Sequence, residues 1–338
     1  MHVTFLVPRI HDRPTGGNVY NRHVAKGLRA HATVEIIPWP PGADLPTAPL
    51  PSDPVVLIDS LLASRPDDLD ALRTAHPAAA FVLVGHYLHC IDPTVPDAPA
   101  AAPERALLSW VDGVVVTSPF ARRALVDEGL AARRIAVAPP GLAPTYRRPV
   151  AERSLNAPPH LLTVASLLPG KGLPRLLDVL ARLADQPWTW TLVGDDTLDP
   201  DFAASLRRQI DARSFSDRVT VTGAVPPDDL QAHYDRADVF VLPSRFETCS
   251  MATREAMARG CPVVAFAVGG LPNNFGDAPA GRLIPPDDTD AFASALRSLL
   301  DDPAARRRMG LAARKQSQSF PSWPTTADRV RAALRRLR

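Results

Sequence analysis

Short apolar runs alternate with helix-like patterns of apolar and polar residues along the first half of the chain. The runs predict six strands, at 3–7, 34–37, 55–61, 80–87, 113–117 and 135–138. Helical periodicity lies between them, at 19–29, 66–75, 103–111 and 119–128. Alternation of this kind predicts a parallel sheet with helices on both faces. The proline-rich stretch 38–54 is expected to be a surface loop.

The same alternation begins again after a charged, proline-containing stretch at 142–159, which we interpret as a linker. Strands are predicted at 161–165, 189–193 and 219–222, and helices at 173–183, 201–213, 227–235, 290–300 and 303–319. The chain is therefore predicted to hold two doubly wound α/β domains, 1–150 and 151–320. Residues 321–338 are expected to form a final, basic helix.

The stretch 237–274 holds the densest pattern in the chain. An apolar run at 237–242 ends at Pro243, a helical pattern runs from about Ser250 to Arg259, and a second buried strand is predicted at 262–268. In an open parallel sheet, ligands bind beyond the carboxyl ends of the strands. The loop that follows residue 242 is therefore a candidate ligand site.

This loop combines carboxylates with a helix start. Backbone N–H groups at Cys249, Ser250 and Met251 are expected to point out of the helix end and attract a phosphate. Glu247 and Glu255 lie on either side, and carboxylates accept hydrogen bonds from hydroxyls. The combination suits a sugar nucleotide. The alternative is that Glu247 caps the helix and Glu255 is a solvated helix residue.

The pattern S-x-x-E-x7-E-A-M-A-x-G-x-P-V-V-A…G-G-L-P, from Ser244 to Pro272, closely resembles the retaining glycosyltransferases of family 4. The resemblance implies the GT-B fold, in which two Rossmann-like domains face each other across a cleft. It also implies a final helix that begins near Trp323 and crosses back to the acceptor-binding N-terminal domain. The chain departs from the family where E-x-F-G-L becomes E-T-C-S-M, and where Asn273 stands in place of Glu.

The resemblance also implies an activity and residue roles. It implies transfer of a hexosyl group from a nucleotide-sugar donor, such as a UDP- or GDP-sugar, with retention and without a metal or resident cofactor. Glu255 would hold the ribose hydroxyls and Glu247 the donor-sugar hydroxyls. Lys171 and the N–H groups around Ser250 would hold phosphate. Glu247, Lys171 and His86 are the residues expected to act in catalysis.

Three further segments resemble the family. Gly16 and Gly17 precede a helix and would let backbone N–H groups approach the donor diphosphate. His86 directly follows an apolar run, so the family's strand-end histidine is assigned to it rather than to His89. The loop that contains Val225 resembles the segment beside the nucleotide base. Each has a plainer interpretation, as a glycine turn, a backbone-bonded histidine or an ordinary loop.

One cation of the family pattern is missing. Lys171 in Gly-Lys-Gly matches the family lysine, but Ser166 stands at the usual arginine position. Arg9, Arg22 and Arg245 are the candidate substitutes. The sequence also lacks an Asp-x-Asp after a strand, and 195–196 is interpreted as a strand-end turn.

Composition and charge further restrict the kind of protein that the sequence can encode. The net charge of +2 predicts no general affinity for nucleic acid. Three scattered cysteines suggest neither a disulfide framework nor a zinc site, and no apolar run approaches membrane-spanning length. We therefore expect a cytoplasmic enzyme, with peripheral membrane contact left open. The acceptor stays open between a small natural product, a sugar and a lipid-linked molecule. The alternatives are a sugar-nucleotide epimerase on the same fold and a nucleotide-sugar binder without transfer activity.

Overall fold

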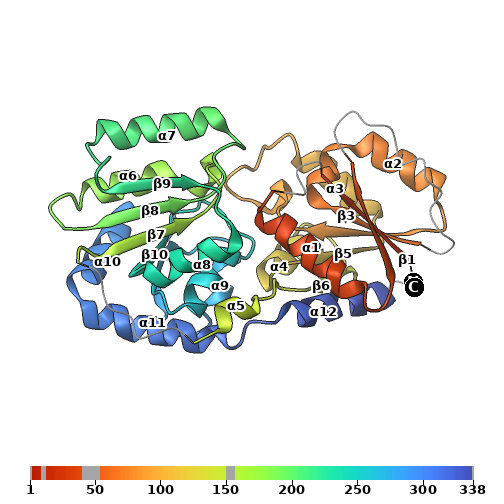
Figure 1. Cartoon of the computed structure of the whole chain (residues 1–338). Helices are drawn as coiled ribbons and strands as arrows, with labels where there is room; N and C mark the ends of the chain where they lie inside the picture. The colour runs from red at the N-terminus through yellow and green to blue at the C-terminus, as the bar shows by residue number, and fades with distance from the viewer. Residues whose placement is uncertain (1, 9–12, 40–53, 150–156, 337–338) are drawn as a thin grey trace. The chain divides into compact units, whose positions relative to one another are not determined.

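The structure is a computed structural model that describes residues 2–8, 13–39, 54–149 and 157–336. The chain divides into two compact units (Figure 1). The first unit is Met1–Gly141 with Pro321–Arg338, and the second is Leu142–Phe320. Within the described residues each unit contains one six-stranded parallel sheet. The prediction of two doubly wound α/β domains is confirmed.

The first unit has strand order β2-β1-β3-β4-β5-β6. Its strands are β1 (His2–Val7), β2 (Thr33–Pro38), β3 (Pro54–Asp59), β4 (Ala80–Gly85), β5 (Gly113–Val116) and β6 (Ile135–Val137). Its α-helices are α1 (Gly16–Leu28), α2 (Pro66–Ala75), α3 (Ala101–Trp110), α4 (Pro119–Asp127) and α12 (Trp323–Arg336). Short 3-10 helices are η2 (Ser60–Ser64), η3 (His89–Ile91) and η4 (Ala132–Arg134). The winding of the chain reverses between β1 and β3, which is where such sheets bind ligands.

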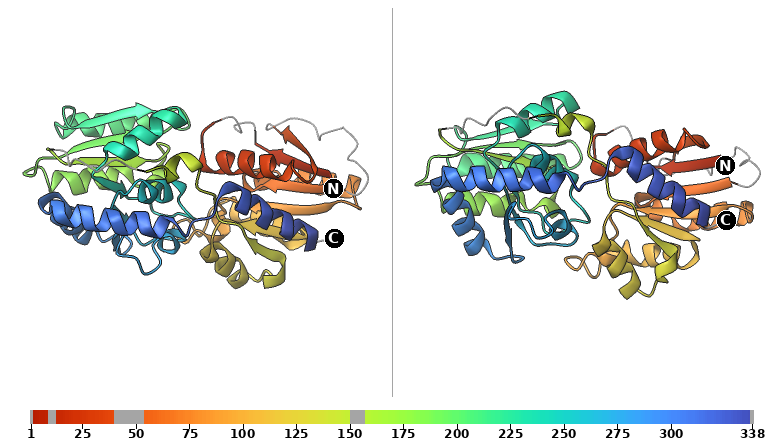
Figure 2. Two further views of the ribbon diagram at one scale, coloured as in Figure 1. Left: turned by 60° about the horizontal axis from the view of Figure 1, so that its bottom comes forward. Right: turned by 90° about the horizontal axis from the view of Figure 1, so that it is seen from below.

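The C-terminal helix α12 completes the first unit by packing along α1, as both views of Figure 2 show. The Trp323 ring stacks on His23 with 4.2 Å between ring centroids. Gly27 permits the close approach, because a Cβ at this position would lie 2.3 Å from Ala327 Cβ. The Thr326 hydroxyl donates to Pro139 O at 2.8 Å. Both polar and apolar contacts therefore join this late segment to the first unit.

The second unit has strand order β12-β11-β10-β7-β8-β9. Its strands are β7 (His160–Val164), β8 (Thr189–Val193), β9 (Val219–Gly223), β10 (Val239–Leu242), β11 (Val263–Phe266) and β12 (Gly281–Ile284). Its α-helices are α5 (Pro144–Arg147), α6 (Leu173–Ala181), α7 (Pro200–Ala212), α8 (Pro227–Arg236), α9 (Met251–Ala258), α10 (Thr289–Asp301) and α11 (Pro303–Ser317). Two 3-10 helices are η5 (Pro169–Lys171) and η6 (Leu271–Asn274). Here the winding reverses between β7 and β10.

Side chains of the second sheet alternate between two apolar layers, as the pleat requires. Val239 and Val241 pack into the layer beneath α6, α7 and α10. Phe240 and Leu242 pack into the opposite layer, with residues of α8 and α9. Figure 1 shows α8 and α9 on the other face of the sheet from α6. Burial on both faces explains why this strand is apolar throughout.

The structure corrects three features of the sequence-based prediction. Strand β3 ends at Asp59 rather than at 61, because Asp59 caps η2 by accepting from Leu61 N at 2.9 Å. The stretch 142–159 was predicted to be a linker, but α5 forms at Pro144–Arg147 and β7 begins at His160. Strand β12 was not predicted. No helix in the described ranges is long and apolar enough to span a membrane.

Candidate functional site

Two loops of the second unit meet where β7 and β10 lie side by side. The loop after β7 ends at Gly172, whose φ of 65° brings it so close to the next loop that a Cβ would lie 2.1 Å from Pro243 O. The Arg245 backbone N–H donates to Gly170 O at 2.9 Å. Glycine is needed here for both its conformation and its missing side chain. The two loops therefore pack against each other and form one continuous surface at the switch point of the sheet.

This surface carries a charge pair. The Lys171 ammonium lies 2.7 Å from Glu247 Oε1, and the Ser244 hydroxyl donates to the same oxygen at 2.8 Å. The Lys171 side chain is 29% exposed and the Glu247 side chain 10% exposed, so the pair is partly shielded from water. We call Lys171, Ser244 and Glu247 the switch-point cluster. Two of the residues predicted for phosphate and sugar binding thus lie in direct contact.

The backbone of Glu247 is held by the glycine pair after β11. Gly270 N–H donates to Glu247 O at 2.7 Å. Gly269 has a φ of 53°, and a Cβ there would lie 2.2 Å from Glu247 O. The two glycines of the G-G-L-P motif therefore pack against the loop that carries Glu247. No role had been assigned to these glycines from the sequence.

Helix α9 begins directly beyond the switch-point cluster. Ser250 is its N-cap, with a φ of 63°, and its hydroxyl accepts from Thr253 N. The helix runs from Met251, so the N–H groups of Met251 and Ala252 lie in a first turn that lacks intrahelical acceptors. Cys249 is buried before the cap, and burial raises the pKa of its thiol. Of the three residues predicted to bind the donor here, Cys249 therefore has a buried, protonated side chain.

A buried amide fixes the entry to this helix. Asn274 Nδ2 donates to Cys249 O at 2.5 Å, and Asn274 Oδ1 accepts from Arg254 Nε at 2.8 Å. Asn274 is fully buried and Arg254 is 8% exposed. Because both partners are satisfied, this network holds the left-handed turn at Ser250 in place.

Glu255 lies on α9 and contacts α8. The Tyr234 hydroxyl donates to Glu255 Oε2 at 2.8 Å. Burial raises the pKa of Glu255 to about 7, and the hydrogen bond from Tyr234 opposes this rise. The Tyr146 ring packs edge-on against Tyr234, with 5.7 Å between centroids. Glu255 is therefore not the solvated helix residue of the alternative interpretation, but an oriented acid that can change charge near neutral pH.

The first unit has its own cluster at the carboxyl edge of its sheet. His86 follows β4, Asp59 ends β3, and Asn21 lies on α1. His86 Nε2 is 2.7 Å from Asn21 Oδ1 and 3.6 Å from Asp59 Oδ2. Asn21 Nδ2 donates to Asp59 Oδ2 at 2.5 Å. We call Asn21, Asp59 and His86 the histidine cluster.

The glycine loop of the first unit contacts this histidine. Helix α1 begins at Gly16, and Thr15 is its N-cap. A Cβ on Gly17 would lie 3.1 Å from the His86 ring, so the loop packs on the imidazole through Gly17. Gly16 is exposed at the first position of the helix. The structure thus brings the predicted glycines and His86 together within the first unit.

The remaining predicted residues fall in several places. Val225 is half-buried between β9 and α8, while Arg22 and Arg245 are exposed. Arg9 lies outside the described residues. His89 Nδ1 is 2.8 Å from Glu104 Oε1, so this second histidine is bound to α3. The 195–196 turn is confirmed: Asp195 Oδ1 accepts from Thr197 N at 2.8 Å.

Sequence reasoning missed Asn21, Asp59 and Tyr234. Each is a single polar residue inside an otherwise ordinary strand or helix pattern. The available signal was weak: Asp59 is a charged residue at the end of an apolar run that was assigned wholly to a strand. Their relation to His86 and Glu255 emerges only when the elements pack.

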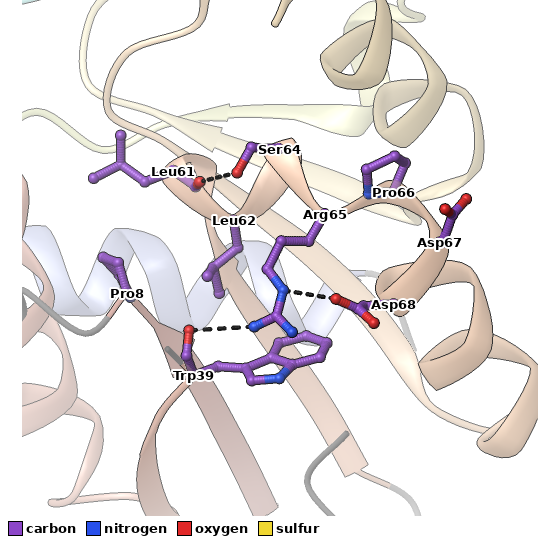
Figure 3. A pocket seen from close by; sticks show the side chains of 9 residues that line it. All are labelled: Pro8, Trp39, Leu61, Leu62, Ser64, Arg65, Pro66, Asp67 and Asp68. Carbon is purple, nitrogen blue, oxygen red and sulfur yellow. Dashed lines mark hydrogen bonds and ion pairs between the residues drawn. The ribbon is translucent and has the colours of Figure 1, made fainter. Parts of the chain in front are cut away.

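A cavity of about 480 Å³ lies beyond β1, β2 and β3 of the first unit (Figure 3). The Arg65 guanidinium lies over the Trp39 ring at 4.2 Å and donates to Asp68 Oδ2 at 2.7 Å. Ser64, Asp67 and Asp68 also line the opening, and the Ser64 hydroxyl donates to Leu61 O (Figure 3). The full lining is Pro8, Trp39, Leu61, Leu62, Ser64, Arg65, Pro66, Asp67 and Asp68.

Comparison with known proteins places these features in a family context. Residues 149–316 match the family model described as glycosyl transferases group 1. A D-inositol 3-phosphate glycosyltransferase of Kineococcus radiotolerans is 34% identical over 260 residues, which cover 69% of this chain and 59% of that protein. The chain thus spans about three fifths of the length of this curated relative. These findings support group 1 glycosyltransferases as the family of the chain.

Two solved structures share the fold. Sucrose-phosphate synthase from Thermosynechococcus elongatus superimposes with a TM-score of 0.81 at 24% identity, over 100% of this chain and 99% of that one. The Anabaena protein HepE, in complex with UDP-glucose, gives a TM-score of 0.77 at 17% identity, over 99% of this chain and 100% of that one. Identity at this level supports the GT-B fold and nothing finer.

Proposed function

We propose that this chain is a group 1 glycosyltransferase that transfers a hexosyl group from a nucleotide-sugar donor to a hydroxyl acceptor with retention of anomeric configuration. The observation that carries the proposal is the contact between Lys171 and Glu247 at the β7–β10 switch point. An isolated ammonium or carboxylate would suit many ligands. A cation beside a carboxylate, next to a helix N-terminus, suits a sugar diphosphate.

The phosphate end of the donor is assigned to Lys171 and the first turn of α9. The Lys171 ammonium is partly exposed, so a phosphate oxygen can reach it. The N–H groups at the start of α9 add positive potential. Together they would stabilise the negative charge that develops on the leaving diphosphate. We therefore propose that the reaction needs no metal ion.

The hydroxyl groups of the donor are assigned to the two glutamates. Glu247 would accept hydrogen bonds from the transferred sugar, since its loop is held by Gly269, Gly270 and Lys171. Glu255 would accept from the ribose, with Tyr234 fixing its orientation. Val225, in the short loop between β9 and α8, is assigned to the nucleotide base. Such fixed acceptors hold the anomeric carbon in one position.

The first unit is assigned to the acceptor. We place His86 beside the reacting sugar and the acceptor hydroxyl, with the Gly16–Gly17 loop near the diphosphate. The cavity is lined in part by Trp39, Arg65 and Asp68, and a carboxylate and a guanidinium suit an acceptor with several hydroxyl groups. The first unit would thus recognise the acceptor and would also contribute contacts to the donor through His86 and the Gly16–Gly17 loop.

The proposed reaction uses no nucleophile from the protein, and every bond formed is matched by one that breaks. The acceptor oxygen forms a bond to the anomeric carbon while the bond from that carbon to the phosphate oxygen breaks on the same face. The acceptor proton passes to the leaving phosphate oxygen. The products are the glycoside and a nucleoside diphosphate. The complex of HepE with UDP-glucose supports a UDP-sugar as the first donor to test.

A donor screen followed by product analysis tests the proposal. Nucleotide sugars are screened by thermal shift, because a bound donor raises Tm by mass action. Donors that bind are then incubated with polyhydroxylated acceptors, and products are identified by mass spectrometry. We expect a glycoside and one nucleoside diphosphate per turnover. Binding without transfer or donor hydrolysis would favour a binding protein, and free epimerised sugar an epimerase.

A further inference from the structure

Asn21 and Asp59 have no part in the proposed chemistry, yet both are polar and almost fully buried. Asn21 is 3% exposed and Asp59 is 1% exposed. They come from α1 and β3, and both lie within reach of His86 after β4. Buried polar groups of this kind are costly unless their hydrogen bonds are satisfied. The positions of Asn21 and Asp59 therefore constrain which ring nitrogen of His86 can carry a proton.

The direction of the hydrogen bonds follows from donor and acceptor chemistry. An ionised Asp59 can only accept, and its Oδ1 already accepts from Leu61 N. The group 2.5 Å from Asp59 Oδ2 must therefore be the donating amide nitrogen of Asn21. The Asn21 carbonyl oxygen then faces His86 Nε2 at 2.7 Å. Since this oxygen can only accept, Nε2 must carry a proton.

The opposite tautomer is disfavoured by the same contacts. A lone pair on Nε2 would face the Asn21 carbonyl oxygen at 2.7 Å and the Asp59 carboxylate oxygen at 3.6 Å. Both contacts would then be repulsive. Rotation of the amide does not relieve this, because the carbonyl oxygen would then face the carboxylate of Asp59.

Other contacts hold the ring in place. The Tyr20 ring packs edge-on against the imidazole, with 5.0 Å between centroids. The His86 backbone N–H donates to Ser60 Oγ at 3.2 Å, directly beyond Asp59 in the chain. Gly17 packs on another part of the ring. The ring is thus fixed in position as well as in protonation.

We propose that Asn21 and Asp59 are positioning residues that hold His86 as the Nε2–H tautomer, so that Nδ1 is the ring atom that accepts a hydrogen bond from a substrate hydroxyl. The second part of this inference rests on the proposed function. It gives His86 a defined role: it orients a hydroxyl as an acceptor and does not donate a proton to it. The tautomer itself is a property of the protein without substrate.

The charge state of the ring agrees with this assignment. Burial lowers the pKa of His86, and the negative charge of Asp59 opposes that effect. The imidazole is therefore expected to be neutral at pH 7.5, where the distinction between tautomers has meaning. Tyr20 and Asn21, which also contact the ring, carry no charge at this pH.

Nitrogen-15 NMR of the full chain tests the tautomer directly. Histidine is labelled with nitrogen-15 and the His86 signals are identified by their loss in His86→Gln. At pH 7.5 we expect a protonated Nε2 and an unprotonated Nδ1. A protonated Nδ1 in the wild-type protein would overturn the inference, whatever any variant does.

Substitutions of Asn21 test the cause. Asn21→Leu removes the acceptor and should give a mixture of both tautomers. It should also lower kcat/KM on the order of 10- to 100-fold, while nucleoside diphosphate affinity stays within about twofold. Asn21→Asp restores an acceptor for Nε2, so it should recover the Nε2–H tautomer, while its second oxygen lies against Asp59 and the two acids are expected to share a proton.

Asn18→Leu is the matched control for the NMR experiment. Asn18 lies one turn earlier on α1, is 2% exposed and donates to Arg13 O. Its replacement should leave the His86 tautomer unchanged. An equal loss of tautomer selection in Asn18→Leu and Asn21→Leu would show a general effect of damaging α1, and would contradict the inference.

The two proposals can fail separately. A chain with the expected tautomer but no transfer to any acceptor would count against the glycosyltransferase assignment alone. A chain that transfers sugar with His86 in the Nδ1–H form would retain the function and lose the positioning role. Asn21→Leu with full activity despite mixed tautomers would overturn the role of Nδ1 in the reaction.

Discussion

The ammonium of Lys171 and the carboxylate of Glu247 lie 2.7 Å apart although 76 positions separate them in the chain. Adjacent strands β7 and β10 place their loops together, and glycines allow those loops to touch. The pair has a consequence for ligand binding. A phosphate that contacts Lys171 must share the ammonium with Glu247, so the cation and the carboxylate are expected to bind neighbouring parts of one ligand.

Lys171→Ala should weaken nucleoside diphosphate binding and leave nucleoside binding nearly unchanged. The loss should be about 1.5–3 kcal/mol, because a charge-assisted hydrogen bond to phosphate disappears and Glu247 is left without its cation. Isothermal titration with both ligands measures the difference. Arg175→Ala is the matched control, since Arg175 is a nearby cation that pairs with Asp287 instead. Equal losses for both ligands would show that Lys171 does not touch phosphate.

Nucleoside affinity should rise with pH until Glu255 is fully ionised. With a pKa of about 7, Glu255 holds a proton at pH 6, whereas ribose hydroxyls favour the carboxylate form. Binding therefore releases a proton, and affinity should increase up to about 10-fold per pH unit below the pKa. A nucleoside is used because it has no phosphate that titrates in this range. Calorimetry from pH 5.5 to 8.5 gives the profile.

Two variants separate the causes of this pH dependence. Glu255→Gln should give a flat profile, since the amide does not titrate. Tyr234→Phe removes a hydrogen bond that favours the charged form, so the pKa of Glu255 should rise and the profile should move to higher pH. A wild-type profile that is flat from pH 5.5 to 8.5 would refute the ribose assignment.

Gly172→Ala should destabilise the protein while Gly170→Ala should not. The first change forces a Cβ to within 2.1 Å of Pro243 O at a φ of 65°, whereas a Cβ at Gly170 meets nothing within 4 Å. The left-handed conformation alone costs about 1–3 kcal/mol, and the clash adds to it. Thermal denaturation of both variants compares two positions in one loop. Equal Tm values would contradict the close packing of the two loops.

Activity should survive exhaustive treatment with EDTA. The proposed neutralisation of the diphosphate uses Lys171 and the first turn of α9, and 195–196 is a closed turn in which Asp195 accepts from Thr197. Initial rates are compared before and after chelation, with added manganese or magnesium as the control. Strict dependence on either ion would require a different account of the leaving group.

An α-linked donor should give an α-linked product. Inversion would need a general base on the far side of the anomeric carbon. In the proposed function, the histidine cluster and the switch-point cluster would instead supply fixed acceptors for hydroxyls and a cation for the leaving group. Proton NMR of the anomeric signal of the product distinguishes the outcomes. A β linkage from an α donor would contradict the retaining mechanism.

Most strands and helices could be predicted because burial on both faces makes each strand a short apolar run. Strand β12 escaped prediction for a physical reason. Its first residues, Gly281 and Arg282, interrupt any apolar run, yet glycine is required because a Cβ would lie 1.9 Å from Val263 O. Packing against β11 thus selects a residue with poor strand propensity.

The site could be predicted only in part. Glu247 and Glu255 stood out within a long motif and Lys171 within a separate Gly-Lys-Gly segment, but their partners did not. Asn21 and Tyr234 lie in ordinary helical patterns. Their contacts with His86 and Glu255 depend on strand order and helix packing. Residue type was readable from the sequence, whereas the pairing of distant residues needed the fold.

The return of α12 to the first unit makes that unit discontinuous along the chain. Its strands are complete by residue 137, but Trp323 and Ala327, which cover His23 and Gly27, come only after the whole second unit. During synthesis on the ribosome, the apolar side of α1 must therefore wait for the last segment to emerge. The strands of the first unit are therefore synthesised before the second unit, whereas the helix that completes the first unit is synthesised after it.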